Sequence, residues 1–406
     1  MSEVNEKIES AKAANPSPAL GDIDLESFSK QAEEHSYQED FSKIAEADRQ
    51  RMEDVGVVLG DSAKRSGTFL QKDHSVIHSK TQQDGVEIMS TPDAMQKYLW
   101  LSDYLWKLVS PEADKFTRFA SDNPYQGYFI RVLPGVKADY PVQSCLYLAK
   151  HGLAQNVHNI VIVEEGAELN IITGCAIAPM NDEGLHVGIS EFYIKKGAKL
   201  NFTMIHNWAP KMEVRPRTGI IIEEDAVFTN NYICLKPVHT LQTYPIARCV
   251  GKNARASFNS VLVATSGAHL DVGSRVLLEA EGTKAEIVSR AITTGGKIIA
   301  RGFLSGQVAD VKGHLECRGL ILGESGTILA IPELEGTVAG VDLSHEAAVG
   351  KIAEEEIEYF MARGLSRDAA VSTIVRGFLS VDIEGLPPEL AAQIQHATDL
   401  SQQEVL

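Results

Sequence analysis

The chain has 406 residues, of which 44% are hydrophobic and 23% are charged, which is typical of a globular protein with a sizeable core. Its 38 lysines and arginines stand against 55 aspartates and glutamates, giving a formal net charge of −17. A chain this acidic repels phosphate backbones and shows no basic stripe, so we expect no nucleic-acid partner.

The cysteines and the first residues bear on the compartment. The chain starts without the apolar core of a secretory signal, and no apolar run reaches the roughly 18 residues of a membrane span. The five cysteines are widely separated and form no CxxC pair, which argues against a disulfide framework and a self-contained zinc site. We therefore expect a cytoplasmic protein with no membrane segment.

The N-terminal third predicts a tail followed by helices. Residues 1–36 are polar, with alanine, serine and proline breaks, and predict a flexible tail. Apolar residues recur at helical spacing over residues 39–54 and 92–120, and Thr91-Pro92 suits a helix start. We expect an N-terminal helical region over residues 37–127.

The middle of the chain, residues 128–341, consists of short β-rich runs separated by a recurring corner of small residues. The corners centre on Gly166, Gly197, Asp225, Asn253, Gly267, Gly282 and Gly326. The first four recur at 28 to 31 residues and the later ones at about 14 or a multiple of it. Gly, Asn and Asp tolerate positive φ, so the pattern predicts a solenoid in which stacked coils share one core. The predicted fold is a mainly β parallel β-helix; the alternative is an ordinary antiparallel β domain with chance similarity between its corners.

Helical spacing returns in the last part, residues 342–406. Ile352, Ile357 and Phe360 mark one helix that Gly364 ends, and Ser366 caps a second. Pro387-Pro388 opens a third. The β-helix is therefore expected to have helical regions on both sides.

No P-loop, GxSxG, HExxH or GxGxxG motif occurs, so we expect neither nucleotide hydrolysis nor another enzyme activity from this chain alone. A set of soft and borderline ligands remains. Cys317 precedes His345 and Glu346 by 28 and 29 residues, about one coil, so the two segments could stack. Thiolate and imidazole both bind iron of iron–sulfur clusters. From the residues alone, burial as a small hydrophobe fits Cys317 and Cys175 at least as well, and His345 with Glu346 could be a solvated pair at a helix start.

Three stretches resemble the SufB/SufD family of iron–sulfur cluster assembly. The first is Gly174-Cys175 with Pro179, Leu185-His186, Glu191, Gly197-Ala198 and Asn207-Trp208. The second runs from Ser344-His345-Glu346-Ala347 to Ile374-Val375-Arg376-Gly377-Phe378. The third comprises Lys64-Arg65-Ser66-Gly67-Thr68 and Asp73-His74-Ser75. The resemblance covers roughly residues 55–395, and its C-terminal part is the most specific.

The resemblance implies a right-handed parallel β-helix that acts as a scaffold in the SUF system. Sulfur from a donor protein would reach Cys175, by motif position the sulfur acceptor. Cys317 resembles the SufB cysteine at the cluster site, Glu346 a SufB glutamate nearby, and His345 the histidine that SufD contributes. A SufC-type ABC ATPase would dock on the C-terminal helical region. The expected cargo is a transient [2Fe–2S] or [4Fe–4S] cluster; a flavin has no support in the sequence.

The resemblance also bears on the partner. In bacteria the cysteine comes from SufB and the histidine from SufD, whereas this chain has both Cys317 and His345. We therefore expect a homodimer, with a second SufB/SufD-type subunit as the alternative. Two other functions stay open: a structural SufD-like partner that binds the ATPase without holding a cluster, and a β-helix carbohydrate-active enzyme, against which the lack of a clear carboxylate pair counts.

Overall fold

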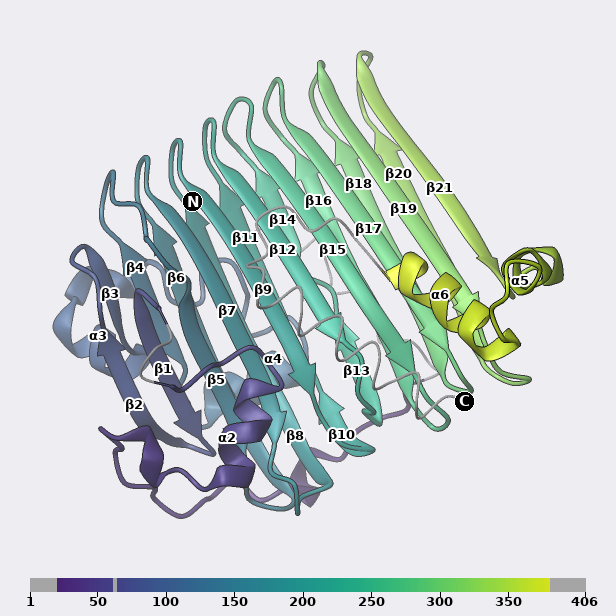
Figure 1. The fold of residues 1–406 in the computed structure, drawn as a ribbon. Coiled ribbons are helices and arrows are strands. Elements are labelled where there is room, and N and C mark those ends of the chain that lie inside the picture. Colours follow the sequence, from purple (N-terminus) through teal and green to yellow (C-terminus); the bar gives the residue numbers. More distant parts are fainter. Residues whose placement is uncertain (1–19, 61–63, 380–406) are drawn as a thin grey trace.

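A computed structural model describes residues 20–60 and 64–379 of the chain. Most strands run parallel. The chain winds through about eight turns, and successive turns stack side by side along one long axis (Figure 1). The predicted parallel β-solenoid is confirmed. Each coil contributes strands to two sheets that face each other across a shared core.

The first sheet has the order β2-β1-β5-β7-β9-β12-β15-β17-β19-β21. Its strands are β1 (Gly67–Lys72), β2 (Ser75–Thr81), β5 (Val142–Leu148), β7 (Glu168–Ile177), β9 (Lys199–Asn207), β12 (Val227–Cys234), β15 (Arg255–Ala264), β17 (Lys284–Thr293), β19 (Val311–Ile321) and β21 (Val341–Gly350). The second sheet consists of β3 (Val86–Ser90), β4 (Tyr128–Val132), β6 (Leu153–Val163), β8 (Glu183–Ile194), β10 (Lys211–Val214), β11 (Arg217–Ile222), β13 (Thr240–Thr243), β14 (Ile246–Cys249), β16 (His269–Leu278), β18 (Lys297–Gly306) and β20 (Thr327–Gly336).

The corners lie where the repeat predicts them. Gly166 and Gly197 have φ of 67° and 66°, and Asp225 and Asn253 have φ of 57° and 60°. Such left-handed backbone is open to glycine and tolerated by Asn and Asp. The Gly166 amide donates to the Lys196 carbonyl of the next coil at 2.9 Å, so each corner also ties neighbouring coils together.

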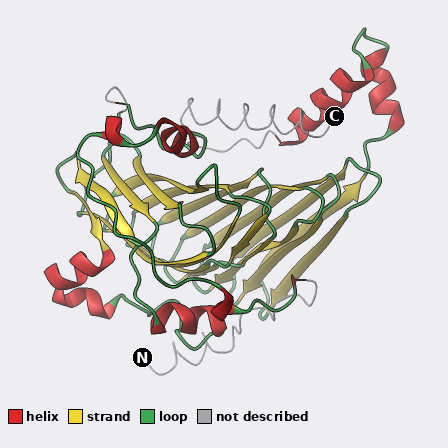
Figure 2. Cartoon of the chain, turned by 90° about the horizontal axis from the view of Figure 1, so that it is seen from below, coloured by secondary structure: helices red, strands yellow, loops and turns green. Residues whose placement is uncertain are grey.

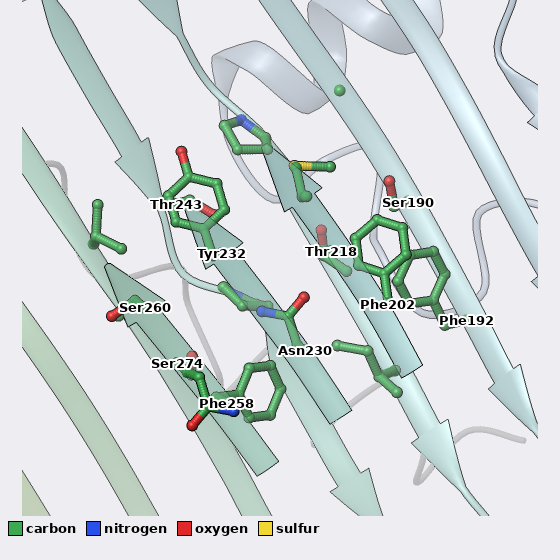
Figure 3. A pocket seen from close by; sticks show the side chains of 18 of the residues that line it. Ser190, Phe192, Phe202, Thr218, Asn230, Tyr232, Thr243, Phe258, Ser260 and Ser274 are labelled. Carbon is green, nitrogen blue, oxygen red and sulfur yellow. The ribbon is translucent and has the colours of Figure 1, made fainter. Parts of the chain in front are cut away.

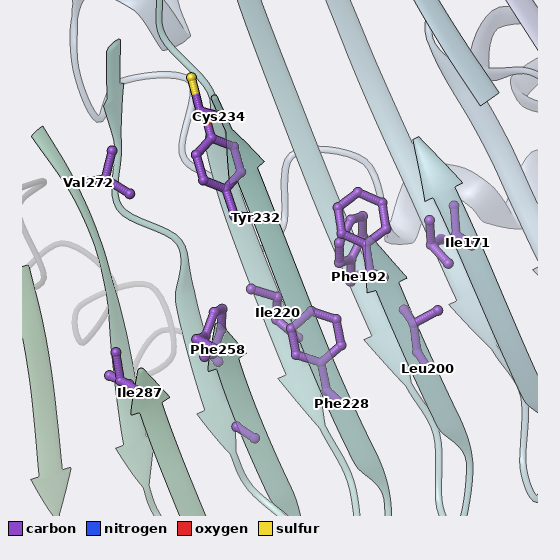
Figure 4. Packing of buried hydrophobic residues seen from close by; sticks show 14 of the residues in the cluster. Ile171, Phe192, Leu200, Ile220, Phe228, Tyr232, Cys234, Phe258, Val272 and Ile287 are labelled. Atoms are coloured by element: carbon purple, nitrogen blue, oxygen red, sulfur yellow. The ribbon is translucent and has the colours of Figure 1, made fainter. Parts of the chain in front are cut away.

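The core is built by alternation along each strand. In-register pairing places side chains of one coil directly beside those of the next, because parallel partners point to the same face. Leu200, Phe228 and Ala256 form such a row. The Phe258 ring lies diagonally beside that of Phe228, with centroids 5.7 Å apart, and Phe192 of the second sheet meets Phe228 across the core at 6.0 Å (Figure 4). Stacked apolar side chains give one continuous core along the solenoid.

The N-terminal part differs from the expected helical region. Residues 37–127 hold helices η3 (Phe41–Lys43), α2 (Glu46–Glu53), α3 (Thr91–Lys97), η4 (Leu99–Asp103) and α4 (Lys115–Asp122), but also the strands β1, β2 and β3. β1 and β2 form a hairpin whose turn residue Asp73 has φ of 53°. β1 pairs with β5 and so begins the first sheet. The described part of the expected tail, residues 20–36, lies against the solenoid. It holds η2 (Leu25–Ser27), and the Ser29 amide donates to the Gly152 carbonyl at 2.8 Å.

The C-terminal boundary is also shifted. β21 runs from Val341 to Gly350, so His345 and Glu346 lie on a strand and not at a helix start. Helix α5 (Glu354–Met361) then ends before Gly364, whose φ is 93°. The Ser366 hydroxyl accepts the amide of Ala369 at the start of α6 (Arg367–Leu379), as predicted. The third predicted helix, from Pro387-Pro388, lies outside the described residues.

The helices lie outside the two strand layers (Figure 2). A second apolar cluster forms where α2 and α6 meet the outer face of the first sheet; it includes Met52, Ile172, Ile292, Leu320 and Val375. Within residues 20–60 and 64–379, no helix combines the length and apolar character that crossing a bilayer requires.

Candidate functional site

Cys317 lies on β19, on the face that points into the solenoid core, and is buried. Its register partners are Ser289 on β17 and Ala347 on β21. Burial raises the pKa of the Cys317 thiol to about 11, with a further upward contribution from Glu316 and a downward one from Arg290. The thiol is therefore protonated at neutral pH, and binding iron would require the loss of that proton.

His345 lies on the same face as Cys317. It pairs with Leu315, two residues before Cys317, on the adjacent strand. With strands about 4.8 Å apart and a rise of about 3.3 Å per residue, the two backbone positions are about 8 Å apart. The expectation that the two segments stack one coil apart is confirmed. His345 is exposed, because β21 is the last strand of its sheet.

Glu346 lies on the opposite face of β21. It pairs with Glu316, and its carboxylate is 3.2 Å from the Arg318 guanidinium. Arg318 also contacts Glu316 at 2.6 Å, and Arg290 contacts Glu316 at 2.5 Å. Within one chain, Glu346 thus belongs to an ion-pair network on the outer surface and does not point toward the Cys317 thiol.

The end of the solenoid exposes side chains that would be core residues one coil earlier. Val349 continues the row of Gly319, and its side chain is 42% exposed. Ile328 of β20 continues the inward row of Ile298, whereas Leu329, 51% exposed, lies on the outer face of the second sheet. Exposed apolar groups next to the open edge of β21 are typical of an interaction surface.

Cys175 lies on β7, on the inward face and fully buried. Burial raises the pKa of its thiol well above the ordinary range, and Cys145 nearby adds to the effect. Its partner on β9 is His206, and the partner of His206 on β12 is Cys234. The row continues through Leu262 and Ala291 to Gly319, two residues from Cys317. Cys175 and Cys317 therefore lie on one face of the same sheet, five strand spacings or about 24 Å apart.

A second, polar row connects these two regions. Cys317 pairs with Ser289, Ser289 with Ser260, and Ser260 with Tyr232. The Tyr232 hydroxyl lies 2.7 Å from Nδ1 of His206, the neighbour of Cys175. The Ser289 hydroxyl is buried and has no hydrogen-bond partner among the described residues. Within the described chain, the row thus runs from Cys317 to the surroundings of Cys175.

An interior cavity of about 50 Å³ follows this row, with room for about three to four water-sized groups. Tyr232, Ser260 and Ser289 line it from the first sheet. Ser190, Thr218 and Ser274 line it from the second sheet, and Figure 3 shows them together with Tyr232 and Ser260. Neither Cys175 nor Cys317 lines this cavity, so the solenoid interior is apolar in bulk and contains a partly polar cavity between the two thiols.

The sequence did not identify the surroundings of Cys175. Cys234 gave no indication of a role, and Trp208 stood out only as part of the stretch that resembles SufB. The rings of His206 and Trp208 have centroids 5.3 Å apart, as have those of His186 and Trp208. Burial lowers the pKa of His206 and lowers that of His186 to about 4, so both imidazoles are neutral at pH 7. The signal available in the sequence was the spacing: Cys175 and His206 are 31 residues apart, and His206 and Cys234 are 28 residues apart. Both intervals fall within the range of the corner repeat.

The ligands of one chain do not form a metal site by themselves. Among residues 20–60 and 64–379, no group of three or more His, Cys, Asp and Glu side chains is placed to hold a metal ion. The buried Cys317 and the exposed His345 are two soft or borderline side chains on the last two strands of the first sheet. Such a site needs ligands from elsewhere, from a second chain or from the cargo itself.

The architecture defines a class: a parallel β-solenoid with buried thiols along its interior and an unfinished ligand set at its end. The family model "SUF system FeS cluster assembly, SufBD core domain" matches residues 146–378. The chain belongs to the SufBD family of iron–sulfur cluster assembly proteins.

The relatives agree over nearly the whole chain. A protein of Archaeoglobus fulgidus named "Iron-sulfur cluster assembly SufBD family protein" is 54% identical over 88% of this chain and 96% of its own length. One of the same name from Methanothermobacter thermautotrophicus is 47% identical over 98% and 99%. The "Iron-sulfur cluster assembly protein SufB" of Bacillus subtilis is 28% identical over 87% and 78%. The predicted family is confirmed, and the carbohydrate-active alternative is set aside.

Proposed function

We propose that this chain is the scaffold on which the SUF system builds an iron–sulfur cluster. Cys175 accepts sulfur as a persulfide, sulfur passes along the polar interior, and Cys317 with His345 holds the nascent cluster. The supporting observation is the polar row of Tyr232, Ser260 and Ser289, which leads to Cys317 along a cavity. Sulfur in this passage is shielded from water and from oxidants.

The cluster is the cargo of the protein, and we propose that two copies hold it. One copy offers Cys317 and an exposed His345 at the end of the solenoid, on the face that also carries the exposed Val349. A second copy docked there by two-fold symmetry would double the ligands. Because β21 is an edge strand, a partner meets both of its faces. We propose that Glu346, held by Arg318, acts at that junction.

We propose that a SufC-type ATPase docks on the C-terminal helices and drives the change at the junction. Tyr359 and Met361 of α5 are exposed apolar side chains, 54% and 43% accessible. Tyr359, Phe360 and Ile374 border a shallow hollow between α5 and α6, together with Glu355 and Glu356. Nucleotide hydrolysis belongs to the partner. The free thiols suit the reducing cytoplasm.

The test is anaerobic reconstitution with iron and sulfide, comparing the wild type with Cys317→Ala and with Cys249→Ala. Cys249 is an equally buried core thiol outside the row and serves as the matched control. We expect the first variant to lose most of the cluster absorbance and the second to keep it. Equal iron and sulfide content in the Cys317 variant and the wild type would remove the proposed role.

A second candidate is a structural SufD-like subunit that binds the ATPase without holding a cluster. The burial of Cys317 and the raised pKa of its thiol favour it, because a protonated thiol is a poor iron ligand. Co-purification with the ATPase, without any cluster after reconstitution, would support this function over the scaffold.

A further inference from the structure

The surroundings of Cys175 contain a second thiol in the same row. His206 on β9 is in register with Cys175 on one side and with Cys234 on the other. All three side chains belong to the inward face, and all three are buried. Tyr232 and Cys234 lie two positions apart on the same strand, and Figure 4 shows both side chains on β12.

Two hydrogen-bond donors at this point lack an acceptor. The Tyr232 hydroxyl lies 2.7 Å from His206 Nδ1 and has no other acceptor among the described residues, so we assign the donation in this bond to Tyr232. The proton of the neutral imidazole is then on Nε2. Nε2 of His206 and Nε1 of Trp208 are both buried without a hydrogen-bond partner among the described residues. Unpaired buried donors are costly and point to a ligand that accepts from them.

We propose that Cys234 is a second sulfur-carrying cysteine that takes sulfur from Cys175, with His206 as the group that carries the proton between them. This inference rests on the proposed function. The sulfur lone pairs of a persulfide on Cys175, which carries its proton when it is attacked, are the acceptor that the two unpaired N–H groups lack. Passing sulfur to Cys234 moves it two strand spacings along the sheet and leaves about 14 Å of the roughly 24 Å path to Cys317.

The transfer is balanced and involves no net oxidation. The sulfur of Cys234 attacks the outer sulfur of the Cys175 persulfide; a new S–S bond forms and the old one breaks. Cys175 leaves as a thiolate and takes up the proton that Cys234 gives up. His206 Nε2–H donates to the leaving thiolate. The Cys234 thiol, which donates to the Lys236 carbonyl at 3.9 Å in this structure, turns to pass its proton to the Tyr232 hydroxyl and through it to Nδ1. About 10 Å separates the backbones of the two cysteines, with His206 between them. A persulfide lengthens the Cys175 side chain by only about 2 Å, so both side chains must turn toward each other and the His206 ring must move aside for the sulfurs to meet.

The test loads the full chain anaerobically with inorganic polysulfide and locates sulfane sulfur on alkylated peptides by mass spectrometry over time. The proteins are the wild type, Cys234→Ser, Cys175→Ser and Cys249→Ser. In the wild type we expect sulfur on Cys175 first, then on Cys234, then on Cys317. In Cys234→Ser it should accumulate several-fold on Cys175 and reach Cys317 more slowly. Cys249→Ser should behave as the wild type.

The outcomes separate this inference from the function on which it rests. If Cys175 is loaded but Cys234 never carries sulfur, or if Cys234→Ser fills Cys317 at the wild-type rate, the relay is wrong and the acceptor role stands. If Cys175 itself is never loaded, both are overturned. A His206→Asn variant adds a second readout: transfer from Cys175 to Cys234 should slow and lose the pH dependence of the wild type, while thermal unfolding shows that the variant is folded.

Discussion

Nε2 of His158 lies 2.8 Å from the Glu191 carboxylate, and both side chains are buried under the segment that follows η4. The same carboxylate accepts the backbone amides of Trp106 at 2.6 Å and Leu108 at 2.5 Å. One side chain of β8 thus fixes a loop that is 83 to 85 residues away in sequence. Its role is structural, although it falls within the stretch that resembles SufB.

Replacing Glu191 with alanine should therefore destabilise the fold strongly. Two or more buried amides and the imidazole would lose their acceptor, for which we expect a loss of about 3–5 kcal/mol in the free energy of unfolding. Urea unfolding measures it, and limited proteolysis should cut near Trp106. Glu223→Ala is the control, because Glu223 forms a partly exposed pair with Lys195 and should cost under about 1 kcal/mol. Equal losses in the two variants would contradict the anchoring role.

Ser289→Ala should stabilise the free protein. The Ser289 hydroxyl is buried and unpaired among the described residues, so its removal should add roughly 1 kcal/mol to the free energy of unfolding. Ser305→Ala is the matched control, since that buried hydroxyl donates to Glu335 at 2.7 Å, and it should lose about 1–2 kcal/mol. Denaturant midpoints compare the two. A loss of stability in Ser289→Ala would mean that the hydroxyl already has a partner, such as bound water.

The rate at which the Cys317 thiol is alkylated should rise with pH, and two neighbouring charges should shift this dependence in opposite directions. With a pKa of about 11, only about one thiol in a thousand is ionised at pH 8, so alkylation should be slow and rise steeply toward pH 11. Glu316 raises this pKa and Arg290 lowers it. Glu316→Gln should therefore speed alkylation at pH 9, and Arg290→Gln should slow it.

The rates are read from the alkylated Cys317 peptide by mass spectrometry. Because the pKa is raised in the folded state, the Cys317 contribution to stability is full below pH 9 and falls as the pH rises through 11. Thermal unfolding at pH 8 and pH 10.5 checks this second consequence. Equal rates in the two variants would show that access to the thiol, and not its ionisation, limits the reaction.

A charge on the last coil should abolish self-association if a second copy covers it. Val349 is 42% exposed on the open inward face of β21. Burying a lysine there should cost on the order of 3 kcal/mol, or about 100-fold in Kd. We expect sedimentation to find a dimer for the wild type and a monomer for Val349→Lys. Met180→Lys, at a 97% exposed side chain, should remain dimeric. A monomeric wild type would contradict the proposed junction.

The corners and the repeat could be predicted because their requirements are local. Gly166 and Asp225 sit where the backbone needs positive φ, and that preference is visible residue by residue. The β1–β2 hairpin was missed, since Asp73 as a turn residue is a single weak signal next to helical spacing on both sides. The packing of residues 20–36 could not be read either, because it depends on the Gly152 carbonyl of a distant coil.

The neighbourhood of Cys317 and His345 could be predicted from the length of the repeat, but the face on which each side chain lies could not. The interval of 28 residues, close to one coil, correctly placed His345 beside the strand of Cys317. The face of each residue depends on exact register, and one position separates His345 from Glu346 on the other side of the sheet. The row of Cys175, His206 and Cys234 needed the structure, because its two steps are of different length, 31 and 28 residues.

His345 is open to its surroundings only because the repeat stops after β21. One further coil on that strand would cover its imidazole as β21 covers Leu315. The number of coils, and not any local feature of residues 344–347, therefore decides whether this histidine is accessible. Lengthening the solenoid by a single repeat would bury the His345 imidazole without changing any residue of β21.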